Sequence, residues 1–133
     1  MPDRARILVF HDEPALGGLL LAHLASEGFN AVDANTPLEV VWTLASGEVQ
    51  LLVVHVFDVV WIAAALLTEL FSFYPTMPVL VLVAPTVSAE DRQLLVRFEN
   101  ARVLNASDDL RGITEAIQEM LCARSRACSG GGA

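Results

Sequence analysis

Residues 6–16 have the sequence RILVFHDEPAL, and this stretch decides the fold. Its four consecutive apolar residues, 7–10, are followed at once by the polar triplet 11–13, as expected for a short strand buried on both faces of a sheet. Pro14 then suits the first turn of a helix, where its missing N–H costs nothing. The stretch therefore predicts a strand over about 6–11 that leads directly into a helix.

The same order of strand and helix recurs along the rest of the chain. The two longest strand-like apolar runs do not alternate with polar residues, so we expect them to be covered by helices on both faces. Thr36 and Ser88 each stand three residues before an acid, a spacing typical of a helix start with a capping box. The predicted strands cover about 6–11, 29–33, 51–56, 79–84 and 102–104, and the predicted helices about 14–27, 36–46, 59–73, 88–99 and 109–124.

Five such units predict an α/β fold with a doubly wound, five-stranded parallel sheet, because right-handed crossovers place helices on both faces. We expect the flavodoxin-like strand order 2-1-3-4-5. In this order the ligand crevice lies at the carboxyl ends of the first and third strands. His11, Asp12 and Glu13 close the first of these strands and His55 closes the third, so any chemistry is expected there.

The length of 133 residues is close to the commonest size of a single domain. Hydrophobic residues make up 54% of the chain and charged residues 18%, which is enough apolar surface for a core. We predict one domain over 5–123 and a flexible tail or linker over 124–133. The tail ends in Ser-Gly-Gly-Gly-Ala, a composition typical of a linker to an output domain beyond it.

The net charge of −8 disfavours direct binding of nucleic acid by this domain. A membrane span is not expected, since the longest apolar stretch, 51–67, contains His55 and Asp58. The N-terminus lacks the layout of a signal peptide, so we expect a cytoplasmic protein. Cys122 and Cys128 are too few for a structural zinc site and are expected to be thiols.

The opening stretch resembles the start of a response-regulator receiver domain of bacterial two-component signalling, in which a strand ends in two adjacent acids, commonly followed by Glu-Pro. The likeness covers about 5–123. It includes the runs 50–55 and 77–84, which are similar to the third and fourth strands of that family, and 89–92, which is similar to the opening of its fourth helix.

The resemblance also implies where the phosphorylation site of the family would lie. His11 stands at the first acid of the pair and Asp12 keeps the second. His55 stands at the phospho-accepting aspartate. Val83 stands at the switch serine or threonine, and Asn105 at the lysine. The resemblance thus implies a degenerate site.

Two further positions depart from the family pattern, since Arg102 stands where a switch aromatic is common and Ala106 where a proline follows the lysine. Asp58, three residues beyond the predicted end of the strand, is a nearby alternative acceptor. We expect it on the rim, out of line with Asp12.

These replacements matter because aspartyl phosphorylation needs a carboxylate nucleophile, Mg²⁺ held by hard oxygen ligands, and a cation for the developing charge. The nucleophile and the cation are replaced here. The resemblance therefore implies a pseudo-receiver without enzymatic activity, with weak or absent Mg²⁺ binding and no other cofactor. It would act through a protein partner or output domain, and we expect a homodimer.

The degenerate crevice leaves an alternative open, in which the domain senses a small ligand or a metal ion. His11, Asp12 and His55 could contact Zn²⁺, Ni²⁺ or Cu²⁺, although they match no established ligand spacing. A phosphohistidine at His55 or a pH-sensing histidine pair is less favoured. A flavodoxin-like enzyme ranks last, because the sequence has no glycine-rich phosphate loop or cofactor fingerprint.

Two surfaces are candidates for an interface. Residues 59–67 are apolar on nearly all sides, and we expect Val60 and Trp61 to form a solvent-facing patch. Trp42 is expected to pack in the ordinary way. The second candidate is the usual dimer face of receivers, made by the fourth helix, the fifth strand and the fifth helix. Its candidate residues are Arg92, Arg97, Arg102 and Arg111.

Overall fold

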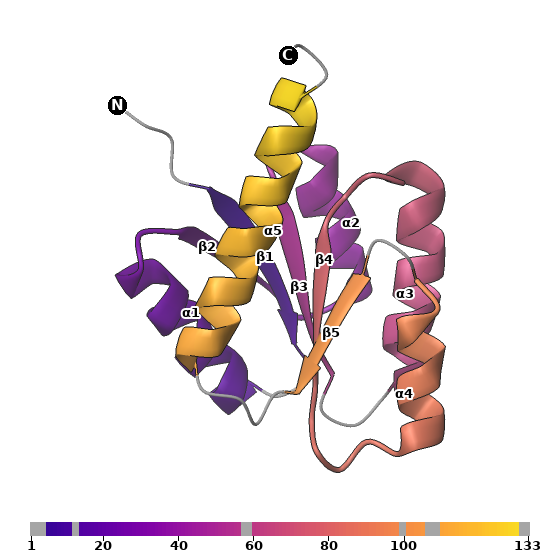
Figure 1. The fold of residues 1–133 in the computed structure, drawn as a ribbon. Coiled ribbons are helices and arrows are strands. Elements are labelled where there is room, and N and C mark those ends of the chain that lie inside the picture. The colour runs from indigo at the N-terminus through magenta and orange to yellow at the C-terminus, as the bar shows by residue number, and fades with distance from the viewer. Residues whose placement is uncertain (1–4, 12–13, 57–59, 99–100, 106–109, 131–133) are drawn as a thin grey trace.

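The computed structural model describes residues 5–11, 14–56, 60–98, 101–105 and 110–130, without the side chains of Pro14, Leu16 and 124–130. Five parallel strands form one sheet in the order β2-β1-β3-β4-β5, and five helices connect or follow them (Figure 1). The predicted doubly wound α/β fold is therefore confirmed. The strands are β1 (Arg6–His11), β2 (Asn30–Ala34), β3 (Leu51–Val56), β4 (Val79–Val83) and β5 (Ala101–Asn105). The helices are α1 (Pro14–Ser26), α2 (Pro37–Ala45), α3 (Val60–Phe73), α4 (Ala89–Val96) and α5 (Leu110–Gly130).

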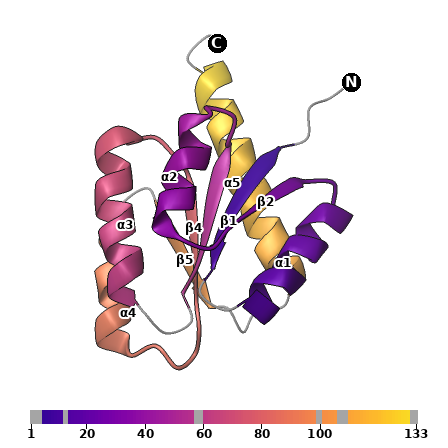
Figure 2. The same cartoon turned by 180° about the vertical axis from the view of Figure 1, so that it is seen from behind.

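The sheet separates two apolar cores, because strand side chains alternate between its faces. Ile7 and Val9 of β1 point to the face covered by α1 and α5, where Leu24 and Ile117 pack against them. Leu8 points to the opposite face, which α2, α3 and α4 cover (Figures 1 and 2). β3 and β4 are buried along their whole length, as their continuous apolar sequences predicted.

The ends of the helices follow from local sequence. The hydroxyl of Thr36 accepts a hydrogen bond from the Glu39 N–H at 3.2 Å, and the hydroxyl of Ser88 accepts one from the Asp91 N–H at 3.1 Å. Both predicted N-caps are therefore confirmed. Gly28 follows α1 with a φ of +93°, a left-handed conformation that glycine adopts without strain.

Two helix ends differ from the prediction. α4 ends at Val96, and α5 continues to Gly130, so most of the segment expected as a flexible tail is helical. The continuation has a simple physical reason: residues 122–128 contain alanine and arginine, which favour helix, and glycine appears only from position 130 onwards. In the described part of the chain, no helix is both long and apolar enough to span a membrane.

Candidate functional site

The candidate site lies at the carboxyl ends of β1 and β3, where two histidines are neighbours. His11 and His55 are Cα partners in the parallel pairing of these strands, so their side chains leave the same face of the sheet. That face is the one covered by α1 and α5, because Val9 and Val53, two residues earlier, belong to its core. Both histidines are buried. The structure thus brings together the two residues that the sequence placed in the crevice.

His11 is held by a carboxylate from the neighbouring strand. Its side chain is 4% exposed, and its Nε2 lies 2.6 Å from Oδ1 of Asp33 in β2. A carboxylate only accepts hydrogen bonds, so Nε2–H donates and Nδ1 is the atom left over. Nδ1 is buried and has no hydrogen-bond partner among the described residues. Among the described residues, the imidazole of His11 is therefore hydrogen-bonded through Nε2 alone.

The other side of the His11 ring lies against α1, at Gly17. A Cβ placed on Gly17 would lie 2.4 Å from Cγ and 2.6 Å from Nδ1 of His11, closer than nonbonded atoms approach. The imidazole fits at this strand end because residue 17 has no side chain. Nδ1 faces the helix at this point, so it has little room for a ligand.

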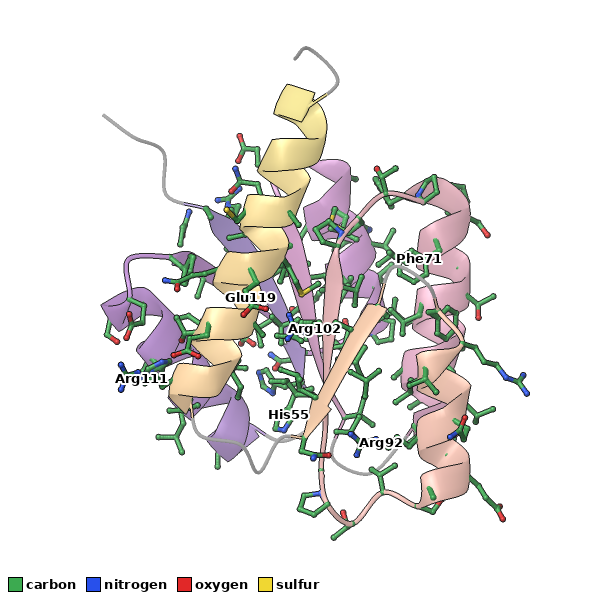
Figure 3. All side chains as sticks on the ribbon, viewed as in Figure 1. His55, Phe71, Arg92, Arg102, Arg111 and Glu119 are labelled. Carbon is green, nitrogen blue, oxygen red and sulfur yellow. The ribbon has the colours of Figure 1, made fainter. Side chains whose placement is uncertain are left out.

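Val83 and Asn105 end the next two strands and are Cα partners. Val83 is fully buried and has no group that can hydrogen-bond a phosphoryl oxygen. Asn105 is exposed, and its Oδ1 accepts a hydrogen bond from Nη1 of Arg92 in α4 at 2.5 Å. A cation thus reaches the position that the resemblance gives to lysine, from a different element. Figure 3 shows Arg92 and His55 at this same end of the sheet.

Several predicted site residues lie outside the part of the chain that the structure describes: Asp12, Glu13, Asp58 and Ala106. Among the described residues, no group of three histidine, cysteine or acidic side chains is placed to hold a metal ion. Asp33, the acid that the described residues place beside His11, already binds its Nε2. The metal-sensing alternative also uses Asp12, which lies outside the described residues, so it stays a prediction.

The apolar patch that we expected from Val60 and Trp61 contains only one of these two residues. Trp61 is 70% exposed, as predicted, but Val60 is only 4% exposed and belongs to the core between the sheet and α3. Trp42, expected to pack in the ordinary way, is 65% exposed. The reason is the orientation of α2, which turns Val40 and Leu44 inward and so leaves Trp42 outside.

Two of the four arginines of the second candidate surface, Arg102 and Arg111, contact acids of their own chain. Nη1 of Arg102 lies 2.8 Å from Oε2 of Glu119 in α5, and the two labelled side chains meet in Figure 3. Nε of Arg111 lies 3.7 Å from Oε1 of Glu115, one helical turn away. Arg97 is exposed at the end of α4.

Sequence reasoning missed Asp33, Gly17 and the link from Arg92 to Asn105. The position of Asp33 was open to inference, since it follows Ala31 by two residues on β2 and so shares its face. The role of Gly17 could not be inferred from the sequence. The clash that this glycine avoids arises only when α1 packs against the end of β1.

The sequence matches no protein-family model and no curated protein. Its fold is similar to many solved structures. The response-regulator receiver domain protein (CheY-like) from Methanospirillum hungatei JF-1 has 19% identity and a TM-score of 0.81, covering 94% of this chain and 99% of that one. The signal receiver domain of an HD domain-containing protein from Pseudomonas fluorescens Pf-5 has 17% identity and a TM-score of 0.83, covering 97% and 95%.

A third similar structure belongs to a longer protein. NtrX from Brucella abortus has 17% identity and a TM-score of 0.79, and the match covers 97% of this chain but 29% of NtrX. Identities this low show the fold alone. The chain therefore has the receiver fold.

Proposed function

We propose that this chain is a receiver domain of bacterial two-component signalling that acts without aspartyl phosphorylation, through binding to a protein partner or an output domain. The observation that carries the proposal is the pairing of His11 with His55 at the carboxyl ends of β1 and β3. The resemblance places an acid and the acceptor aspartate at these two positions. An imidazole cannot form an acyl phosphate, so the usual covalent signal has no attachment point there.

The neighbouring positions support the same conclusion. Val83 offers a hydrocarbon where the switch hydroxyl would hydrogen-bond the phosphoryl group, and Asn105 offers an amide in place of an ammonium. Arg92 brings a cation to Asn105, but its Nη1 donates to the amide oxygen. With few oxygen ligands left, the proposal includes weak or absent Mg²⁺ binding and no catalytic role.

Intact-mass spectrometry after incubation with Mg²⁺ and acetyl phosphate tests the proposal. The mass should stay unchanged, while a working receiver domain treated in parallel gains one phosphoryl group. A gain that Asp58→Asn abolishes would identify Asp58 as an acceptor and overturn the proposal. A gain that persists in Asp58→Asn and disappears in His55→Gln would identify a phosphohistidine and overturn it as well.

Homodimerisation through α4, β5 and α5 is the second part of the proposal and rests on the resemblance. Arg102 and Arg111 already pair with acids of their own chain, so Arg97 is the cation of this face best placed for a partner copy. Sedimentation velocity should show a dimer that Arg97→Glu weakens. A monomer at every concentration would contradict the proposed homodimer. It would not affect the proposal that the domain acts without aspartyl phosphorylation.

A further inference from the structure

An apolar groove lies between α2 and α3. The two helices lie side by side on the outer surface of the molecule (Figure 2). It consists of two hollows of about 530 and 180 Å³. Both are lined by Val41, Leu66 and Glu69, so they are continuous, and we call them together the α2–α3 groove. Large apolar side chains are exposed along it or beside it: Leu38, Val41, Trp42, Trp61 and Phe73.

The exposed apolar surface is large for a molecule of this size. Trp61 and Phe73 are 70% and 73% exposed at the two ends of α3. An aromatic side chain has on the order of 200 Å² of surface, so the five exposed side chains together present roughly 600 Å². A typical monomer exposes at most about that much in its largest patch, and such patches are often functional. We therefore expect a partner to cover this groove.

The charges around the groove indicate what kind of partner fits. Glu69 is the charged side chain in the described lining of both hollows, and Glu39 is the other ionisable residue of the two helices. Neither α2 nor α3 contains a basic residue, and the whole chain carries a net charge of −8. A second copy would bring the same acids to the groove. A basic partner would bring the complementary charge.

The length of the groove suits a short helix. Trp61 and Phe73 are twelve residues apart on α3, which corresponds to about 18 Å along the helix axis. A bound helix of about twelve residues spans the same length. Its apolar residues at spacings of three and four would face the groove, as in other complexes of a helix with a groove.

We propose that the α2–α3 groove binds an amphipathic helix of another protein, with an apolar stripe flanked by lysine or arginine. This inference deepens the proposed function, on which it rests, because it names the docking surface and the chemistry of the partner. The apolar stripe would cover Trp61 and Phe73, and a basic side chain would meet Glu69.

Of the two tryptophans of the protein, Trp61 lines the larger hollow and can report its occupancy, whereas Trp42 is exposed on α2 beside the lining residue Val41. The probe is a synthetic helical peptide of about fourteen residues without aromatic side chains, with leucines at helical spacing and lysines on its flanks. The control peptide has the same sequence with glutamate in place of every lysine. The lysine peptide should shift the tryptophan emission to shorter wavelengths in a saturable way and bind at least tenfold more tightly than the glutamate peptide.

Variants locate the binding site. Phe73→Ser and Leu38→Ser should each weaken the lysine peptide about tenfold, whereas Leu19→Ser, an equally polar change at an exposed leucine of α1, should have no effect. Glu69→Lys should reverse the preference between the two peptides. Equal binding of both peptides, or equal effects of Leu38→Ser and Leu19→Ser, would overturn the inference.

Two further experiments are informative. Self-association that Phe73→Ser abolishes and Arg97→Glu leaves intact would make a second copy the occupant and overturn the inference. Repeating the titration with Mg²⁺ and acetyl phosphate separates it from the proposed function: a mass gain with unchanged peptide binding contradicts only the phosphorylation-independent part. An unchanged mass without peptide binding contradicts only the inference.

Discussion

The imidazole of His11 lies directly against the backbone of Gly17, so a Cβ at residue 17 would fall 2.4 Å from Cγ of the ring. The ring has little freedom to move away, because it is buried at a strand end and its Nε2 binds Asp33. The histidine at the end of β1 can therefore be accommodated only because α1 has a glycine at residue 17. A side chain at residue 17 would therefore require a smaller residue than histidine at position 11.

Replacing Gly17 with alanine should destabilise the protein by about 2 kcal/mol, since the added methyl group forces a packed ring to shift. Gly18→Ala is the matched control. A Cβ there meets nothing within 4 Å, so alanine should leave stability unchanged or raise it by up to about 1 kcal/mol through helix propensity. Urea unfolding followed by circular dichroism measures both. Equal effects at 17 and 18 would contradict the steric explanation.

A double-mutant cycle assigns the penalty to His11. In a His11→Ala background the ring is gone, and Gly17→Ala should lose most of its penalty, giving a coupling energy of about 1–2 kcal/mol between the two positions. An undiminished penalty in that background would mean that the glycine is needed for another reason.

The fold was predictable from the sequence because each strand and helix has its own local pattern, and the order of strand and helix repeats along the chain. Continuous apolar runs such as 79–83 predict buried parallel strands, and Thr36 and Ser88 predict helix starts. The orientation of α2 was not predictable in the same way. Its sequence, PLEVVWTLA, is apolar on most sides, so periodicity alone does not decide whether Val40 or Trp42 faces the sheet.

Removing the carboxylate that holds His11 should cost more than removing one from an exposed ion pair. Asp33→Ala leaves the buried Nε2–H without its acceptor, and we expect a loss of about 1–2 kcal/mol. Glu119→Ala, which breaks the exposed pair with Arg102, should cost less than about 0.5 kcal/mol. Thermal unfolding monitored by calorimetry compares them.

The amide in Asp33→Asn retains an acceptor oxygen and should restore more than half of the stability lost in Asp33→Ala. Identical losses in the two Asp33 variants would show that the hydrogen bond with His11 contributes little. This prediction also tests the site where sequence reasoning was weakest. The predicted strand order already placed β2 beside β1, but the register that pairs Val9 with Asp33 had to be known before Asp33 could be paired with His11.

The N-cap of α2 should contribute to the stability of one wall of the α2–α3 groove. Thr36→Ala removes the oxygen that accepts from the Glu39 N–H, and should cost about 1 kcal/mol. Thr36→Ser keeps that oxygen and should leave the stability about unchanged, because serine is at least as good an N-cap as threonine. Hydrogen exchange of the first amides of α2 measures the effect locally. Unchanged exchange in Thr36→Ala would contradict the capping role.

The exposure of Trp42 is where structure and sequence disagree most clearly, and fluorescence decides between them. Trp61→Phe leaves Trp42 as the single tryptophan, and Trp42→Phe leaves Trp61. With 65% and 70% of these side chains exposed, both variants should emit near the wavelength of tryptophan in water and be quenched by acrylamide almost as efficiently. A short-wavelength, poorly quenched emission from Trp61→Phe would mean that Trp42 is packed, as its sequence context suggested. The exposed apolar surface beside the α2–α3 groove would then be smaller than the structure indicates.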